Sequence, residues 1–221
     1  TDINGSYLMH IAADGSTIAR LDLSDTNNED NEDGMSGNLS SFAVDAAGNL
    51  YVSDYNNIYV LDAEGNVQFK LDGSQYNGSL CRLNAQQVGV MWYNYTDDVN
   101  AADENGQYFV PIDLETKDWG EKVKLPSNVG SILPGDDAYD FYYTYNNNIY
   151  GYTAKTDTKD KLVDWLACDV DTNNMSGYAM LSDSRVAALM QDWSTDPTTY
   201  QLIVLHRVDA SEIKEKKVLT L

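Results

Sequence analysis

Basic residues are scarce in this sequence, in which 14 Lys and Arg stand against 35 Asp and Glu, for a formal net charge of −21. A surface this negative repels nucleic-acid phosphates and anionic lipid headgroups, because binding to either depends on Lys and Arg. Long apolar runs are missing as well, and none approaches the roughly 18 to 20 residues that a membrane-spanning helix needs. We therefore expect neither a nucleic-acid partner nor a membrane span in this chain.

Cysteine and histidine are also rare, which limits nucleophile and metal chemistry. Cys81 and Cys168 are the two cysteines, too few for a disulfide framework and lacking the short spacing of a four-ligand zinc site. We expect two buried thiols here, and a Cys81–Cys168 disulfide is the less favoured alternative. The two histidines, His10 and His206, lie in apolar strand-like segments, and there is no G-x-S-x-G nucleophile motif. The sequence therefore predicts no catalytic residue and no cofactor.

Sequence patterns typical of helices are almost absent, whereas patterns typical of strands recur along the whole chain. The clearest segment covers residues 41–73, with apolar stretches at 42–44, 50–52, 58–61 and 67–71. Turn sequences separate them: Asp45-Ala-Ala-Gly-Asn49, then Asn56-Asn57, then Asp62-Ala-Glu-Gly-Asn66. Four short strands joined by hairpins make one blade of a β-propeller. Only residues 210–217 (ASEIKEKK) have a helix-like composition, and they could form about one helical turn.

The same grouping of strands returns at 81–125, 139–166 and 178–221. Comparable turns at Asn57 and Asn147 have one unit between them, so the period is about 45 residues, close to that of propeller repeats. We predict an all-β fold, a β-propeller of four-stranded antiparallel blades. We expect about five blades. The ring could also be incomplete or truncated, because Tyr7–Ile11 and Ile18–Leu23 supply only half a blade. A sandwich or barrel would explain the alternation but not the repeat.

The chain is expected to form a single domain over 1–221 that was excised from a longer protein. It begins at Thr1 without a basic, hydrophobic leader, and strand-like residues follow almost at once.

Two acid-rich segments are candidates for calcium, which prefers hard oxygen ligands. One is the loop at 25–34, and the other supplies Asp169, Asp171 and Asn173. Neither has the Glu expected at position twelve of a calcium loop, and the first has Asp30 where Gly belongs. Solvated loops are therefore favoured over bound Ca²⁺ at both places.

Aromatic residues near strand ends are candidates for a carbohydrate-binding surface. Trp92, Trp119 and Tyr145 are the residues we would choose, and Trp119, at a turn, is expected to be the most exposed. The favoured alternative is that these rings pack between neighbouring sheets, as large side chains on repeated sheets usually do.

Two family resemblances follow from particular motifs. Residues 44–65 resemble an NHL-type repeat, with an apolar strand, D-x-x-G-N, an apolar-Tyr-Val-x-Asp segment and a second D-x-x-G. A wider resemblance, to the N-terminal propeller region of extracellular solute-binding lipoproteins from Gram-positive gut bacteria, rests on these segments: LCRL (80–83), VGV (88–90), LPGDDAYDFYY (133–143), NIYGY (148–152), WLACDVD (165–171) and KVLTL (217–221).

The second resemblance implies a protein outside the cell, anchored to the surface in its full-length form, with a solute-binding domain downstream that 217–221 would open. It implies no functional residues for the propeller region. The function that we favour is a non-catalytic extracellular binding or scaffold module of such a sugar- or peptide-uptake lipoprotein, with a glycan or a protein as its partner. The alternatives are a propeller glycosidase or lyase that uses channel carboxylates, and a structural spacer.

Overall fold

The computed structural model describes residues 7–11, 16–22, 39–54, 56–98, 104–146, 148–181 and 185–220. Within these ranges the chain consists of β-strands, turns and short 3₁₀ segments, without an α-helix. No helix in this part is long and apolar enough to cross a membrane. Contacts divide the chain into two compact units, Thr1–Ser127 (unit 1) and Asn128–Leu221 (unit 2).

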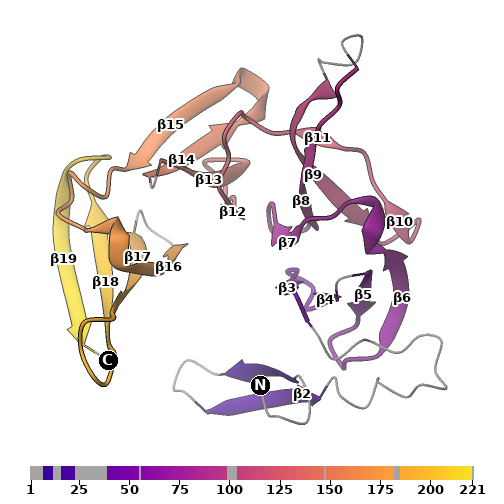
Figure 1. Cartoon of the computed structure of the whole chain (residues 1–221), viewed down its shortest axis with the longest axis horizontal. Coiled ribbons are helices and arrows are strands. Elements are labelled where there is room, and N and C mark those ends of the chain that lie inside the picture. Colours follow the sequence, from indigo (N-terminus) through magenta and orange to yellow (C-terminus); the bar gives the residue numbers. More distant parts are fainter. Residues whose placement is uncertain are drawn as a thin grey trace. The chain divides into compact units, whose positions relative to one another are not determined.

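Unit 1 contains a hairpin and two larger antiparallel sheets (Figure 1). The hairpin consists of β1 (Tyr7–Ile11) and β2 (Thr17–Asp22). The first sheet consists of β3 (Ser41–Val44), β4 (Leu50–Ser53), β5 (Asn57–Leu61) and β6 (Val67–Asp72). The second has β7 (Ser79–Arg82), β8 (Val88–Asn94) and β9 (Gly106–Asp113), with β10 (Asp118–Trp119) and β11 (Val123–Lys124) both paired to β9.

Unit 2 contains two four-stranded antiparallel sheets, each built from consecutive strands. The first consists of β12 (Ile132–Pro134), β13 (Phe141–Tyr145), β14 (Asn148–Thr153) and β15 (Thr158–Val163). A 3₁₀ turn, η5 (Thr172–Asn174), leads into the second, which consists of β16 (Met175–Met180), β17 (Arg185–Asp192), β18 (Thr199–Arg207) and β19 (Ile213–Thr220).

The prediction of an all-β fold made from four-strand antiparallel units is confirmed. The described residues form four such larger sheets, one of which carries a fifth short strand, and not the expected count of about five units. The two strands at the N-terminus were expected as a half unit, and they pair with each other as a two-stranded sheet. The number of units is lower than expected because, among the described residues, no third or fourth strand pairs with these two.

Each unit has its own core, formed where two sheets meet face to face. In unit 1, Tyr51 and Val60 of the first sheet lie in one cluster with Val90 and Val110 of the second. In unit 2, a corresponding cluster joins residues of both sheets: Tyr142, Ile149 and Val163 with Val186, Ala188 and Leu205. A sheet buries one apolar face by packing on another layer, which is why these sheets occur in pairs within a unit.

The helix-like segment at 210–217 is mostly strand, which corrects the prediction of a helical turn. From Ile213 onward, β19 pairs with β18, in a register running from Arg207↔Ile213 to Gln201↔Thr220. The long edge of β18 offers backbone partners over eight residues of β19, and this tertiary pairing overrides the helix propensity of Lys and Glu. Residues 217–220, which the sequence resemblance assigned to a following domain, belong to this outer strand.

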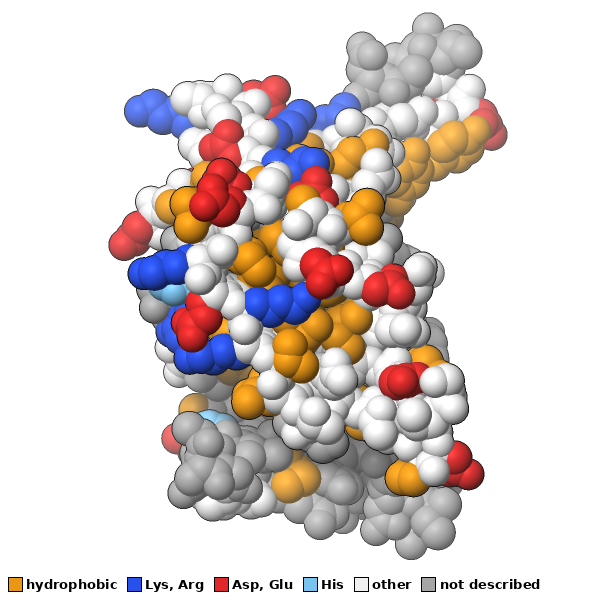
Figure 2. Space-filling view, turned by 90° about the vertical axis from the view of Figure 1, so that its left-hand side faces the viewer, with side chains coloured by type: hydrophobic (Ala, Val, Ile, Leu, Met, Phe, Trp, Pro, Cys, Tyr) orange, Lys and Arg blue, Asp and Glu red, His pale blue; other side chains and the backbone are white. Residues whose placement is uncertain are grey.

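The lysines concentrate on the outer strands of the sheets. All ten lie in β6, β10, β11, β15 or β19, or within three residues of one of these strands. Figure 2 faces the side on which β19 lies in Figure 1, and it shows Lys and Arg side chains spread among hydrophobic ones. Charged lysines on an edge strand oppose pairing with the edge of another chain. The placement of the lysines is thus of the kind that opposes edge-to-edge aggregation.

Candidate functional site

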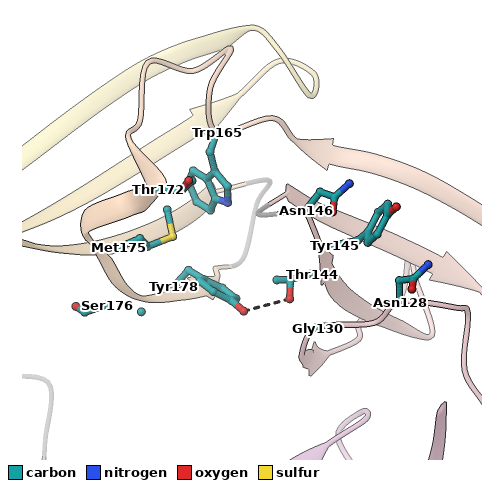
Figure 3. Close-up of a pocket in the computed structure, with 11 residues that line it drawn as sticks. Asn128, Gly130, Thr144, Tyr145, Asn146, Trp165, Thr172, Met175, Ser176 and Tyr178 are labelled. Carbon is teal, nitrogen blue, oxygen red and sulfur yellow. Dashed lines mark hydrogen bonds between the residues drawn. The ribbon is translucent and has the colours of Figure 1, made fainter. Parts of the chain in front are cut away.

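A pocket of about 460 Å³ lies in unit 2, at the end of the two sheets where β13 finishes and β16 begins (Figure 3). This volume lies within the range of roughly 300 to 1,000 Å³ for small-molecule sites. We name it the Trp165 pocket, and its described lining consists of Asn128, Gly130, Thr144, Tyr145, Asn146, Trp165, Thr172, Met175, Ser176, Gly177 and Tyr178.

Two asparagines in left-handed backbone conformation stand at the mouth of the pocket. Asn128 has φ = 67° and precedes β12, and Asn146 has φ = 45° in the turn after β13. Asn adopts this conformation more readily than most residues, because its short polar side chain tolerates it. Both side chains are exposed, so the two turns present amide groups that can donate and accept hydrogen bonds.

One wall of the pocket is an irregular stretch of β16. The pairing with β17 shifts between Met175↔Met190 and Gly177↔Leu189, which is a β-bulge at Ser176. In a regular strand successive residues point to opposite faces, but here four residues in a row, from Met175 to Tyr178, line the same pocket. The bulge brings four successive residues to the pocket wall, while the Ser176 hydroxyl donates to the Leu189 carbonyl oxygen at 3.2 Å.

The floor carries three connected hydroxyl groups. The Thr144 Oγ1 atom accepts the Ser131 backbone N–H at 3.0 Å and lies 3.0 Å from the Ser131 Oγ atom. The Tyr178 hydroxyl contacts Ser131 Oγ and also donates to Thr144 Oγ1 at 3.4 Å (Figure 3). Because Thr144 lies on β13 and Tyr178 on β16, this network ties the two sheets together beneath the pocket.

Trp165 is the most deeply buried aromatic residue of the lining, with 2% of its surface exposed. Its ring belongs to the core cluster of unit 2. Within the described part of the chain its indole N–H has no hydrogen-bond acceptor, and this nitrogen is not sealed from solvent. Figure 3 shows the ring entering the pocket with its nitrogen toward Thr144 and Asn146. A buried indole N–H normally finds a partner, so the pocket offers one donor that a ligand can use.

The described lining contains no side chain that is charged at neutral pH, although the chain as a whole carries a net charge of −21. It provides aromatic and thioether surface beside hydroxyl and amide groups. Such a surface can bind an uncharged polar molecule through stacking and hydrogen bonds. It offers no carboxylate, imidazole or amine for proton transfer to a bound substrate.

Of the three aromatic residues chosen from the sequence, Tyr145 lines the pocket, whereas Trp92 and Trp119 lie in unit 1. Both tryptophans pack edge-on against Tyr76, with ring centroids 5.1 and 4.9 Å away. The Lys122 ammonium also lies 5.5 Å from the centre of the Trp92 ring. The expectation that Trp119 is the most exposed tryptophan is wrong. It is half-buried, and Trp193 is 71% exposed.

The residues proposed for calcium follow Trp165 along the chain. Asp169 has φ = 55°, and its carboxylate lies 3.7 Å from the Lys216 ammonium. Asp171 caps η5 by accepting the Asn173 backbone N–H at 3.0 Å. Among the described residues, no group of three or more His, Cys, Asp or Glu could hold a metal ion. Calcium binding through Asp169, Asp171 and Asn173 was the less favoured alternative and is untested, and the other candidate loop, 25–34, lies outside the described residues.

Sequence reasoning did not single out Asn128, Trp165 or Tyr178 as binding residues. The turn at Asn147 was recognised from the sequence, whereas Trp165 entered as the first residue of the WLACDVD segment. Tyr178 gave no signal of its own, because one tyrosine in a strand looks like any other half-buried residue. The residues that line the pocket are distant in the sequence. They come together because β12 and β16, the first strands of the two sheets of unit 2, lie next to each other.

Both cysteines are free thiols in the structure, Cys81 in β7 and Cys168 in the loop after β15. Burial raises the pKa of the Cys81 thiol to about 12 and also raises that of Cys168, whose Sγ atom lies 3.8 Å from the Ala210 carbonyl oxygen.

We expect both thiols to react slowly with a disulfide reagent at pH 8 in the native protein. A pKa of about 12 leaves roughly a thousandfold less thiolate than an ordinary cysteine has at that pH. Unfolding without a reductant should release two reactive thiols, which can be counted by absorbance. Rapid reaction in the native state, or no free thiol after unfolding, would contradict this expectation, and Cys81→Ser and Cys168→Ser assign the two signals.

No model of a known protein family matches the chain, and no curated protein matches it. Several solved structures resemble it weakly. The extracellular domain of the B. thetaiotaomicron one-component system BT4673 aligns with 86% of this chain and 24% of its own, at 13% identity and a TM-score of 0.44. Kuenenia stuttgartiensis hydrazine synthase aligns over 81% and 49%, at 10% identity and a TM-score of 0.45. The WD40 domain of SCAP from fission yeast aligns over 96% and 49%, at 10% identity and a TM-score of 0.41.

The chain thus spans less than half the length of each of these proteins. Likenesses at such identities and scores assign neither a family nor a function.

Proposed function

We propose that this chain is a non-catalytic binding module and that unit 2 holds a small uncharged ligand in the Trp165 pocket. One observation carries the proposal. The pocket combines exposed and buried aromatic rings with amide and hydroxyl groups, while its described lining has no charged side chain. A few placed polar groups on a largely apolar, concave surface are characteristic of small-molecule sites.

Binding is favoured over catalysis because of what reaction chemistry needs. Glycoside hydrolysis uses two carboxyl groups on either side of the bond that breaks. Acyl transfer uses a nucleophile activated by a base within hydrogen-bonding distance. The Thr144 and Tyr178 hydroxyls bond Ser131 and each other, and the described lining brings no base to them.

The wider setting of the module is also a proposal. We propose that the four-stranded sheets belong to one propeller outside the cell, attached to a surface-anchored solute-binding protein for sugars or peptides. The sequence resemblance of the segments between 80 and 221 supports this setting, and the repeated four-strand sheets agree with it. Labelling of intact cells with an antibody against the chain tests the location, and signal only after lysis would contradict it.

The binding function is tested by thermal unfolding with a panel of solutes. The panel contains uncharged sugars, nucleosides and end-capped peptides, together with charged analogues of each. A true ligand at about 100 times its Kd should raise the Tm by about 5 °C or more, because it binds only the folded state.

Two results would contradict the proposed function. The first is stabilisation by charged analogues alone. The second is a chemical change in the stabilising solute after incubation with the protein, measured by chromatography.

A further inference from the structure

We infer that the Trp165 pocket is a site for a neutral carbohydrate, with one sugar ring stacked on Tyr145 and its hydroxyls bonded to Asn128, Asn146 and Trp165. This inference rests on the proposed function, since it names the class of ligand for the same pocket. It uses three separate properties of the lining: one accessible aromatic ring, one unused buried donor, and a set of groups that both donate and accept hydrogen bonds.

The accessible ring is that of Tyr145, with 38% of the residue exposed. It stands at the mouth of the pocket between Asn146 and Asn128 (Figure 3). The ring of Tyr150 packs against it in a tilted arrangement, with ring centroids 6.2 Å apart. The π face of an aromatic ring carries partial negative charge and attracts polarised C–H groups. The C–H face of a pyranose provides such groups, and one ring serves one sugar face.

The unused donor is the indole N–H of Trp165. The residue is 2% exposed, its N–H has no acceptor among the described residues, and the nitrogen is turned into the pocket (Figure 3). An unpaired buried polar group costs free energy until a ligand or water satisfies it. A sugar hydroxyl or ring oxygen is an acceptor of the required kind, and it would be held between this donor and the Tyr145 ring.

The remaining polar groups match hydroxyls better than they match charges. The amides of Asn128 and Asn146 each donate and accept, as sugar hydroxyls do, so neighbouring hydroxyls can bond one amide in two ways. A carboxylate, phosphate or ammonium group would lose its hydration here without gaining an opposite charge. A nucleobase has two flat faces to cover, whereas Trp165 exposes too little of its ring to form a second stacking surface opposite Tyr145.

The test measures binding of neutral and charged saccharides by an array followed by calorimetry. We expect neutral saccharides to bind and sulfated or uronate analogues to bind more weakly. Asn146→Gly removes the amide but keeps the backbone conformation, because glycine accepts φ = 45° without strain. Trp165→Phe removes the N–H and keeps an aromatic ring. Each variant should weaken binding roughly 3- to 10-fold, the effect of one hydrogen bond.

Matched controls lie outside the pocket. Lys117→Gly also replaces an exposed residue with positive φ, at 56°, and Trp193→Phe also removes an indole N–H. Both should bind like the unchanged protein. If Trp165→Phe fails to fold, the Asn146→Gly and Lys117→Gly pair still decides the result, because both positions are exposed.

The outcomes separate this inference from the proposed function. Neutral-saccharide binding that Asn146→Gly weakens and Lys117→Gly does not would support both. Binding of nucleosides or end-capped peptides in place of saccharides, with the same dependence on Asn146, would overturn the carbohydrate assignment and leave the binding function standing. Failure of every uncharged solute to bind would overturn both.

Discussion

Replacement of Asp45 with Ala is expected to lower the free energy of unfolding by about 3 kcal/mol, because it removes a buried acceptor of four hydrogen bonds. The Asp45 carboxylate accepts the backbone N–H groups of Ala47 and Asn49, both at 2.9 Å. It also accepts the Asn49 side-chain amide at 2.8 Å and the Tyr51 hydroxyl at 3.2 Å. Asp45 lies in the turn between β3 and β4, so the loss affects the turn that joins the edge strand β3 to the rest of the first sheet.

Tyr51 accounts for much of this cost, because it is 1% exposed and no water can replace the lost acceptor easily. Burial and the nearby Asp45 carboxylate raise the pKa of its phenol well above the usual value. The phenol therefore keeps its proton and remains a donor at neutral pH. In an Asp45→Ala background, Tyr51→Phe should recover part of the loss, because it removes the donor left without a partner.

The matched control is Asp62→Ala, at the second D-x-x-G-N turn of the same sheet. Asp62 accepts the backbone N–H groups of Glu64 and Asn66, at 3.0 and 2.8 Å, and side-chain amides of Asn66 and Gln68. This set of bonds resembles that of Asp45, but it is exposed to solvent, so water can take over the lost bonds. Urea unfolding of both variants should show the smaller loss for Asp62→Ala. Equal losses would mean that turn geometry, and not burial, sets the cost.

These two turns also explain why the first sheet could be predicted so closely from the sequence. Gly48 and Gly65 have φ of 89° and 90°, a conformation that few other residues adopt. The preceding Asp holds the turn through hydrogen bonds to backbone N–H groups, which is the ordinary Asx-turn mechanism. Each turn therefore encodes its own geometry within five residues, and the strands between them follow from alternation of apolar residues.

The strand at β19 could not be predicted in the same way, because its conformation is decided outside its own sequence. Residues from Lys214 to Lys217 favour a helix by composition, and only the unpaired edge of β18 selects the strand. The Trp165 pocket could not be predicted from local sequence for the same reason. Local sequence indicated an Asn-rich turn at 146–148, but the bulge at Ser176 and the contact of Tyr178 with Ser131 depend on pairing between distant segments.

The aromatic residues show where composition alone stops being informative. Trp92, Trp119 and Tyr145 were chosen together because each lies near a strand end. The structure separates them because Tyr76, just after β6, fills the space beside both tryptophans and packs with them against the core of unit 1. No comparable ring covers the Tyr145 side that faces the pocket in Figure 3, among the residues drawn there.

Replacement of Gly177 with Phe is expected to weaken ligand binding by about 10-fold or more, because it adds bulk to one wall of the Trp165 pocket. A Cβ atom placed on Gly177 meets no other atom within 4 Å. Gly177 also lines the pocket, and the open space around it leaves room for a larger side chain at this wall. Gly130 differs, although it lines the same pocket, because a Cβ there would lie 2.8 Å from Thr144 Oγ1.

Calorimetry of a series at position 177 tests this expectation, with binding expected to weaken steadily from Ala to Leu to Phe. Ala179→Phe adds the same bulk two residues along β16, at an exposed position outside the pocket lining, and should bind like the unchanged protein. Circular dichroism and the Tm show whether each variant keeps its fold. If a folded Gly177→Phe protein binds its ligand as tightly as before, the expectation is wrong and the ligand does not contact this wall of the pocket.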